Sequence, residues 1–470
     1  MSINISIVSE QIAQKLIAPA KQLHKEGIPI HAYLSDLTWL LFLKIAPALG
    51  QKSYLSSDYS WERLVQTNGI KQYHYYQEII KQMGQVNHSQ IAGIYAYADT
   101  FLKTPAQLAQ IITALTAIEK VPIKDLGAIY ETLLDKSTHL DGKRLHLVPR
   151  SLVNLMVILS QPQLGELIQD PLAGTASFIV AAHEYMQMMK DELLESSPSL
   201  SNKPPHFRAV EPDLVRQRLA LMNCFLHQIE NSDNVPVQWG DRLLSEFDGW
   251  PQADVIFSVL VFASAPWEEL GKHDVSLALL QQIYQTLKPG GRAAVVLPDH
   301  LLRAVGPAQQ VRRTLLDTCV VHTILRLPYG IFYPHKVAAH LLFFWRSPTS
   351  SQKTKTVWFY DLRTHFPIFG RYLHLKREHL LPFEKVYGDD PLGQAPRHLN
   401  PNDKHWFCFD RDRLAKQNDR LDLCCLTEDK WMEIDKIKEP NMIKPNVTEK
   451  IWNVLEKTMD DLEDLTQILG

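Results

Sequence analysis

The chain has 470 residues and 45% of them are hydrophobic, which excludes disordered and fibrous classes and predicts about two to four folding units with buried cores. Its 49 Lys and Arg residues nearly balance its 52 Asp and Glu residues, and the net charge of -3 excludes strong attraction of the whole chain to DNA or an anionic membrane. Five cysteines without CxxC spacing argue against a disulfide framework and a zinc site, and they predict a reducing, cytoplasmic location. We expect no secretory signal and no membrane span, because no apolar run is long enough for either.

Two patterns follow one another along the chain. Residues 8–120 carry apolar side chains at every third or fourth position, as in QIAQKLIAPAKQL, which predicts an all-α N-terminal domain over residues 1–125. From residue 164 short β-type runs, such as ELIQDP, FRAVEP and RAAVVLP, alternate with helical segments. This alternation predicts an α/β domain over residues 126–350, built on a doubly wound, mostly parallel sheet.

The C-terminal part contains one further predicted strand and one predicted helix. The run VWFYDLR is a strand candidate within an otherwise Pro-rich, irregular region over residues 351–445. Residues 446–470 are expected to form a helix, because Ile451, Leu455 and Leu462 share one face. An apolar stripe needs a cover, so this helix is predicted to bind a partner protein, with packing onto the chain's own core as the alternative.

Three strand ends carry features of a ligand site. The segment DPLAGTASF, residues 170–178, follows a predicted strand and opens a helix, and its small residues around Gly174 let a ligand approach the backbone. A lone glycine is weak support, since many α/β proteins need only a tight turn there. The next two strands end in Glu211 and Asp241, and an acid after the second strand is the arrangement that binds ribose hydroxyls. Together these features predict a nucleoside-cofactor site.

Ordered motifs along nearly the whole chain are similar to those of one family. They include DLTWLLFLK, LGAIYETLL, VPRSLVNLMV, RLALMNCFLH, TLKPGGRAAVVLPD and HTILRLPYGIFY. The chain resembles the DNA-methylating modification subunits of type I restriction-modification systems, which transfer methyl from S-adenosylmethionine to adenine N6. The resemblance implies a Rossmann-like class I methyltransferase sheet with an all-α N-terminal domain and a C-terminal helical tail. It also implies S-adenosyl-L-methionine as the cofactor.

The resemblance assigns the cofactor site residue by residue. Asp170, Gly174 and the turn after it would border the methionine part of the cofactor, Glu211 its ribose and Asp241 its adenine. The segment LHLVPR, residues 145–150, stands where the family closes over the cofactor, although only its last two residues match the family motif. Ala176 and the residue after it replace two glycines that the family usually has. The expected cofactor-binding residues are His146, Pro149, Arg150, Asp170, Gly174, Thr175, Ala176, Ser177, Glu211 and Asp241.

The fourth strand departs from the family at the catalytic motif. Adenine-N6 methyltransferases end this strand with Asn or Asp, two prolines and an aromatic residue. The side-chain oxygen and a proline carbonyl orient the target amine, while the aromatic ring stacks on the flipped base. Val259, Leu260, Val261 and Phe262 stand in these positions here, and only Phe262 keeps its type. Because valine has no acceptor, we expect methyl transfer to be impaired or lost, and the loop that follows looks shortened as well.

Two functions of different classes remain. The first is an adenine-specific DNA methyltransferase that works beside a specificity subunit and a restriction subunit and reaches double-stranded DNA through that complex. The second is a non-catalytic scaffold, or a DNA- or cofactor-binding subunit, derived from such a methyltransferase. The resemblance favours the first function by descent, and the replaced catalytic motif favours the second. The 19 histidines form no HExxH pattern, so we expect no metal site.

Overall fold

The structure, a computed structural model, divides into two compact units, Met1–Leu423 and Cys424–Gly470. All described residues belong to the first unit, so the predicted partner-binding helix over residues 446–470 lies outside them. No helix among the described residues is long and apolar enough to cross a membrane. The described ranges are 7–48, 59–119, 121–141, 148–193, 205–229, 235–243, 249–262, 275–333, 335, 337–349, 352–364, 366–370, 373–398 and 405–423.

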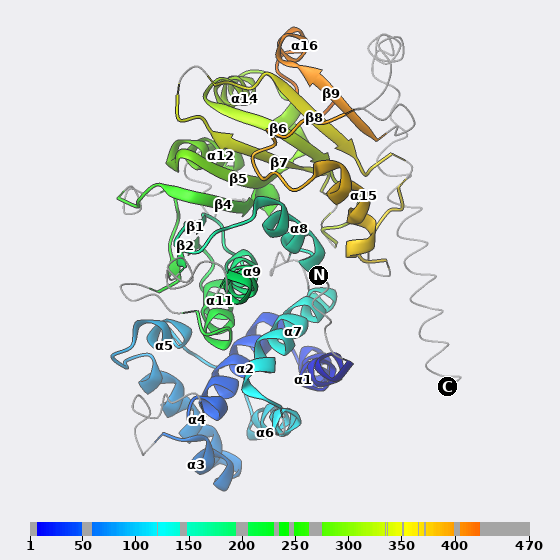
Figure 1. Ribbon diagram of the computed structural model, residues 1–470. Coiled ribbons are helices and arrows are strands. Elements are labelled where there is room, and N and C mark those ends of the chain that lie inside the picture. The colour runs from blue at the N-terminus through cyan, green and yellow to red at the C-terminus, as the bar shows by residue number, and fades with distance from the viewer. Residues whose placement is uncertain are drawn as a thin grey trace, which may run out of the picture. The chain divides into compact units, whose positions relative to one another are not determined.

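The N-terminal region is helical, as predicted (Figure 1). Nearly every side chain of its second helix is buried, because that helix is apolar around its whole circumference and lies inside the bundle. A capping box between Thr104 and Gln107 fixes the start of the sixth helix. The helices are α1 (Ile7–Lys25), α2 (Ile30–Ile45), α3 (Trp61–Gln66), α4 (Gly69–Met83), α5 (Ser89–Ile94), α6 (Pro105–Ala114) and α7 (Leu126–Asp141), with 3-10 turns η2 (Leu115–Ile118) and η3 (Ile123–Asp125).

A nine-stranded sheet follows in the order β3-β2-β1-β4-β5-β7-β6-β8-β9. Strands β1 to β5 are mutually parallel, whereas β7 runs antiparallel between β5 and β6. The predicted methyltransferase-like sheet is therefore confirmed, with its first turn at the end of β1, which lies between β2 and β4. The strands are β1 (Leu167–Asp170), β2 (His206–Glu211), β3 (Val237–Trp239), β4 (Ala253–Val259), β5 (Leu287–Pro298), β6 (Cys319–Arg326), β7 (Ala339–Arg346), β8 (Thr356–Asp361) and β9 (Trp406–Asp410).

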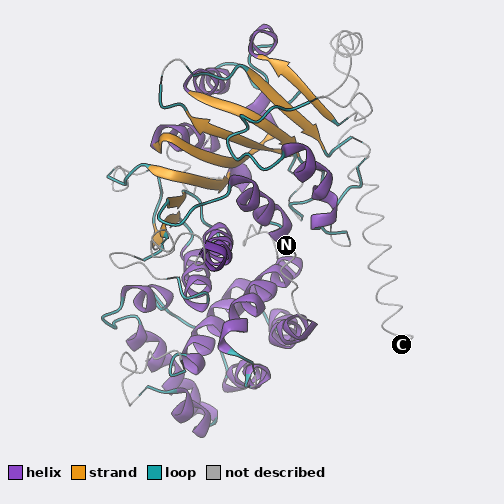
Figure 2. Ribbon diagram, viewed as in Figure 1, coloured by secondary structure: helices purple, strands orange, loops and turns teal. Residues whose placement is uncertain are grey.

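Helices cover both faces of the sheet (Figure 2). On one face α8, α9, α11 and α15 join the N-terminal helices in a continuous apolar core. On the other face α12, α13, α14 and α16 close a second core. Burial on both faces explains why the middle strands β5 and β7 carry the long apolar runs AAVVLP and LLFFW. The bounds are α8 (Arg150–Ser160), α9 (Ser177–Leu193), α11 (Leu214–Leu226), α12 (Val275–Thr286), α13 (Asp299–Arg303), α14 (Pro307–Thr318), α15 (Arg377–Tyr387) and α16 (Arg411–Lys416).

The region after residue 350 is more regular than expected. The VWFYDLR run forms β8, as predicted, and pairs in parallel with β6. Strand β9 then adds an antiparallel edge, where Trp358 stacks on Trp406 at 4.8 Å and Phe359 on Phe407 at 5.5 Å between ring centroids. Cross-strand aromatic pairs of this kind stabilise the pairing of β8 with β9. The sequence did not predict β9, because the region around it is rich in proline.

One arginine joins the sheet domain to the helical bundle. Arg218 of α11 donates from Nε to the Ile94 carbonyl at 3.0 Å, from Nη1 to Ser35 Oγ at 3.0 Å and from Nη2 to the Ala96 carbonyl at 2.9 Å. Its guanidinium also lies 4.6 Å from the centroid of the Trp39 ring. All three acceptors belong to the N-terminal region, so a single buried cation connects the two parts.

Candidate cofactor and catalytic site

A pocket lies where β1, β2 and β4 end, at the carboxyl edge of the parallel strands. This is the edge at which open α/β sheets bind ligands. It brings together the turn after β1, the acid after β2 and two residues of the replaced catalytic motif. Its lining residues are Val148, Leu172, Ala173, Gly174, Thr175, Ser177, Phe178, Glu211, Arg216, Val259 and Phe262. Six of the residues predicted for the site therefore meet here, although they come from three segments of the sequence.

The other predicted residues that the structure describes do not line this pocket. Asp170 and Ala176 are fully buried, and Pro149 is the N-cap of α8. Asp241 follows β3, and its Oδ1 accepts from the Leu243 N–H at 2.9 Å. The neighbouring Gly240 N–H donates to the Glu211 carbonyl at 3.2 Å, so the two predicted acids stand on adjacent strand ends. His146 lies outside the described residues.

The turn after β1 has the backbone form of a ligand-binding turn. Gly174 has φ +57°, and a Cβ at this position would meet nothing within 4 Å, so the turn presents open space to the pocket. Ala176 has φ +64° and is fully buried, a left-handed conformation that costs an L residue ~1–2 kcal/mol. The alanine that replaces a family glycine is therefore held in a strained conformation.

We expect Ala176→Gly to be neutral to stabilising, raising the free energy of unfolding by up to ~1 kcal/mol. Relief of the left-handed strain outweighs or balances the loss of one buried methyl and the greater entropy of glycine in the unfolded chain. The matched control is Ala173→Gly in the same turn, which lacks a positive φ and should lose ~1 kcal/mol. Urea unfolding of both variants measures the difference, and equal destabilisation would contradict the strain.

Asp170, the last residue of β1, accepts a hydrogen bond from the backbone of the turn that follows it. Its Oδ1 accepts from the Leu172 N–H at 3.0 Å and from Ser258 Oγ at 3.4 Å, while Oδ2 is buried without a hydrogen-bond partner. Burial raises the pKa of this carboxyl to about 7, and the nearby Glu211 charge adds to the effect. A buried acceptor without a donor is a feature that a bound ligand or water would satisfy.

Glu211 is 1% exposed, and its carboxylate is already engaged. Oε2 accepts from the Gly174 N–H at 2.8 Å, which ties the ends of β1 and β2 together. Oε1 accepts from the Asp213 N–H at 2.9 Å and from Arg216 Nε at 2.8 Å. Burial raises the pKa of Glu211, against the lowering effect of Arg216. The predicted ribose acid is thus present in the pocket with a cation beside it, which the sequence analysis did not anticipate.

Val259 and Phe262 of the replaced catalytic motif line one side of the pocket, which we call the catalytic wall. No side chain at positions 259–262 can accept a hydrogen bond. Val259 ends β4, is 4% exposed and lines the pocket. The Leu260 side chain turns away into the core on the α12 face, and its carbonyl accepts a hydrogen bond from Ser276 Oγ at 2.8 Å. Phe262 packs its ring against Phe332 at 5.5 Å between centroids. The carbonyl at the first proline position is therefore engaged within the protein as well.

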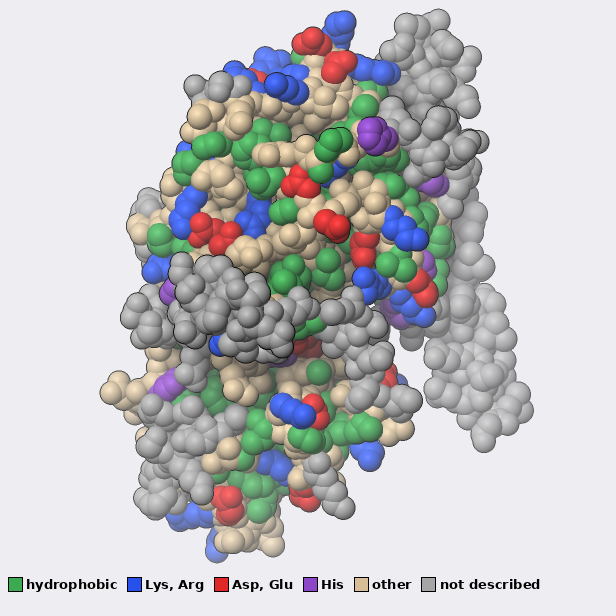
Figure 3. Space-filling model, in the orientation of Figure 1, with side chains coloured by type: hydrophobic (Ala, Val, Ile, Leu, Met, Phe, Trp, Pro, Cys, Tyr) green, Lys and Arg blue, Asp and Glu red, His purple; other side chains and the backbone are tan. Residues whose placement is uncertain are grey.

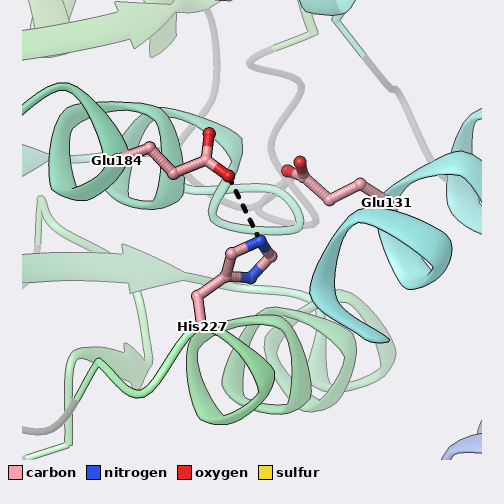
Figure 4. Close-up of side chains that lie close together, drawn as sticks. All are labelled: Glu131, Glu184 and His227. Atoms are coloured by element: carbon pink, nitrogen blue, oxygen red, sulfur yellow. Dashed lines mark ion pairs between the residues drawn. The ribbon is translucent and has the colours of Figure 1, made fainter. Parts of the chain in front are cut away.

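Arg150 lies in an ionic network beside the pocket. Its Nη1 is 2.5 Å from Glu131 Oε1 of α7, and its Nη2 is 2.7 Å from Glu184 Oε2 of α9. His227 Nε2 is 3.5 Å from Glu184 Oε1, so side chains from three helices converge (Figure 4). Burial opposes the charging of His227, but the hydrogen bond to Glu184 and the Glu131 charge outweigh it and raise its pKa. A donor of Arg150 also lies 3.4 Å from the Ser177 carbonyl, which ties α8 to the cofactor turn.

Glu131, Glu184 and His227 have ligand atoms within 4.8 Å of one another, a spacing that a metal ion can use. The Arg150 guanidinium bridges the two carboxylates and already supplies the countercharge that an ion would bring. A larger pocket adjoins the first through Val148, Thr175 and Ser177, and these charged side chains line it. The network therefore shapes the pocket and anchors the segment that precedes α8.

Arg216, Ser276 and the Glu131–Glu184–His227 group were not found from the sequence. Arg216 had one usable signal, since it lies five residues after a strand-end acid in the first turn of a helix. Ser276 had none, because only the fold brings α12 beneath the end of β4.

Comparison with known proteins decides the family. Residues 122–423 match the N-6 DNA Methylase family. The chain is 31% identical over 510 residues to the type I restriction enzyme StySJI methylase subunit of Salmonella typhimurium, covering 98% of this chain and 96% of that protein. It is 32% identical over 511 residues to the EcoKI methylase subunit of Escherichia coli, with the same coverage. The chain belongs to this family. It is a methylase subunit of the type I restriction enzyme kind, as the sequence motifs predicted.

Solved structures of type I methylase subunits agree with this assignment. The crystal structure of the EcoKI M protein matches with 28% identity and a TM-score of 0.53, covering 98% of this chain and 96% of that chain. A modification subunit of a putative type I restriction enzyme from Vibrio vulnificus matches with 20% identity and a TM-score of 0.64, covering 86% and 93%. At that identity the second likeness shows the fold alone.

The match to the StySJI subunit includes positions that this chain lacks. The alignment with the StySJI subunit spans 510 positions against a chain of 470 residues, so at least 40 positions of that relative have no counterpart here. The loop after β4, residues 263–274, looks shortened in the sequence and lies outside the described residues.

Proposed function

We propose that this type I methylase subunit binds S-adenosylmethionine but has lost efficient transfer of its methyl group to adenine N6. The observation that carries this proposal is the pocket wall at Val259, which offers no side-chain acceptor for the target amine, while the neighbouring Leu260 carbonyl already accepts a hydrogen bond from Ser276 Oγ. The fold is that of a methyltransferase, and the pocket wall at Val259, where the target amine would lie, is apolar. The second candidate function, a scaffold or a DNA- or cofactor-binding subunit, follows from the same wall.

The residues of the pocket fit the cofactor. Gly174 leaves open space at the turn, Asp170 keeps a buried acceptor without a donor, and Glu211 stands at the end of β2. We assign the methionine part to the turn of residues 174–177, the ribose to Glu211 and the adenine to Asp241. When bound, S-adenosylmethionine supplies an electrophilic methyl group for transfer. Arg150 would act here by positioning, because its guanidinium holds the segment before α8 against Glu131 and Glu184.

The catalytic wall explains why the chemistry would fail. A flipped adenine would present its N6 hydrogens to Val259, leaving buried donors unpaired at ~1–3 kcal/mol each. The Leu260 carbonyl, the second acceptor, is held by Ser276 Oγ. Loss of one preorganised polar group typically lowers a rate by ~10²–10³. Phe262 keeps an aromatic face at this wall, so DNA binding can outlast methyl transfer.

We further propose that the subunit works in the cytoplasm within a type I complex, where a specificity subunit and a restriction subunit are its partners and double-stranded DNA is reached through them. The charge of the chain supports this arrangement. Basic and acidic side chains are interspersed on the face seen in Figure 3, without one extended surface of a single sign among the described residues. A subunit with a net charge of -3 therefore depends on partners for most of its attraction to DNA.

Calorimetric titration with S-adenosylmethionine tests the cofactor assignment. We expect the wild type to bind, and Glu211→Ala to weaken binding by roughly 10- to 100-fold, because a buried charged hydrogen-bonding group is removed. Glu378→Ala, at an exposed acid of α15, is the matched control and should bind as the wild type does. Equal affinity of all three proteins, or binding by none, would contradict the assignment.

A further inference from the structure

Arg216 places a positive charge inside the pocket that we assign to the cofactor. It is the third residue of α11 and lines the pocket together with Gly174, Glu211 and Val259. Its Nε and Nη2 lie 2.8 and 2.7 Å from Glu211 Oε1. The Arg216 side chain is 14% exposed and the Glu211 side chain is 1% exposed, so solvent screens this pair only weakly.

The pair leaves the pocket close to neutral. Glu211 is the one acidic residue among the lining residues, and its charge is balanced by Arg216. Asp170 lies behind the turn, where burial raises the pKa of its carboxyl to about 7, so it carries only part of a negative charge at neutral pH. The described lining therefore offers little net negative charge to a cationic ligand.

We propose that Arg216 is a specificity-determining residue that makes this pocket favour neutral adenosyl thioethers over adenosyl sulfonium ligands. The inference rests on the proposed cofactor site. An adenosyl sulfonium carries a fixed positive charge, which an unpaired Glu211 would attract and which Arg216 offsets. A thioether, the form that remains after methyl transfer, carries no such charge, so Arg216 does not weaken its binding. A subunit with this preference would keep the thioether product bound in its pocket. This agrees with a role in binding and not in methyl transfer.

Calorimetry with S-adenosylmethionine and S-adenosylhomocysteine measures the preference as a ratio of dissociation constants. We expect the wild type to bind the thioether at least about tenfold more tightly, since tenfold corresponds to one modest charge interaction. Arg216→Gln keeps hydrogen-bond donors but removes the charge, and it should lower the ratio several-fold by strengthening sulfonium binding. Arg216→Lys keeps the charge and should keep the ratio.

Glu211→Gln is the reciprocal variant, because it leaves Arg216 without its counterion and should raise the ratio further. Arg208→Gln, on β2 outside the pocket lining, is the control and should leave the ratio unchanged. Thermal unfolding of each variant establishes that it is folded. If both ligands bind and Arg216→Gln leaves the ratio unchanged, the inference is overturned while the cofactor site stands. If neither ligand binds any variant, the cofactor site and this inference fall together.

Discussion

Wild-type protein supplied with a specificity subunit, S-adenosylmethionine and a cognate DNA site should transfer methyl to adenine only at background level. The reason is local, since the side-chain acceptor for the target amine is missing. Val259 replaces it, and the Leu260 carbonyl, the second acceptor, already takes a hydrogen bond from Ser276 Oγ at 2.8 Å. Loss of one preorganised polar group lowers a rate by ~10²–10³, and competition from Ser276 for the second acceptor lowers it further. Radiolabelled methyl incorporation is the measurement.

Restoring the wall should restore part of the rate, in two steps. The triple variant Val259→Asn, Leu260→Pro, Val261→Pro supplies the amide oxygen and the proline geometry, and should rise above background. Adding Ser276→Ala frees the carbonyl at position 260 and should raise the rate further. Ser276→Ala alone is the matched control and should stay at background, because it does nothing for position 259.

Each outcome of this series of variants identifies a different cause of the observed methyl transfer rate. Robust transfer by the wild type would mean that another residue supplies the acceptor. If the triple variant gains activity and the added Ser276→Ala has no effect, the hydrogen bond from Ser276 to the carbonyl at position 260 does not lower the rate of methyl transfer. Continued silence in all variants would point to the segment after Phe262, where the sequence looks shortened.

The fold could be predicted from the sequence because the spacing of apolar residues along each element matches the faces that are buried in the structure. The AAVVLP and LLFFW runs of β5 and β7 are apolar since helices cover both faces of the sheet, and α2 is mostly apolar all round since it lies inside the bundle. Strand β9 escaped notice because its stability comes from aromatic pairing with β8, a relation between residues 358 and 406 that no local pattern contains.

The candidate site was predictable only where its residues lie at strand ends. Glu211 and Val259 end β2 and β4, and Gly174 lies in the turn after β1, so the rule that ligands bind at carboxyl ends brings them together in advance. Arg216 and Ser276 act on backbone or side chains that other elements deliver to them, so their roles appear only once distances are known. The same limit applies to Ala176, whose identity was noticed but whose left-handed backbone was not.

Arg218→Met should lower the free energy of unfolding by about 3–5 kcal/mol, the cost of breaking a buried, hydrogen-bonded charge. Arg218 is 4% exposed and joins α11 to the helical bundle. Its loss leaves the partly buried Ala96 carbonyl without the donor seen here, while the Ile94 carbonyl keeps the Trp39 Nε1 donor at 2.9 Å. It also removes the charge that opposes the raised pKa of Asp36. Urea unfolding gives the magnitude.

Two further variants show whether the effect comes from the joint between the helical bundle and the sheet. Arg218→Lys keeps the charge but cannot reach three separate acceptors, so it should lose less than Arg218→Met and more than nothing. Arg303→Met, at an exposed arginine of α13, should stay within about 0.5 kcal/mol of the wild type. If Arg218→Met were no more destabilising than Arg303→Met, apolar packing of α11 on α2 and α5 would hold the two parts together without the arginine. We expect the larger loss because Arg218 is a buried cation of α11 whose three guanidinium nitrogens all donate to acceptors of the helical bundle, which the fixed fork of the guanidinium satisfies at once.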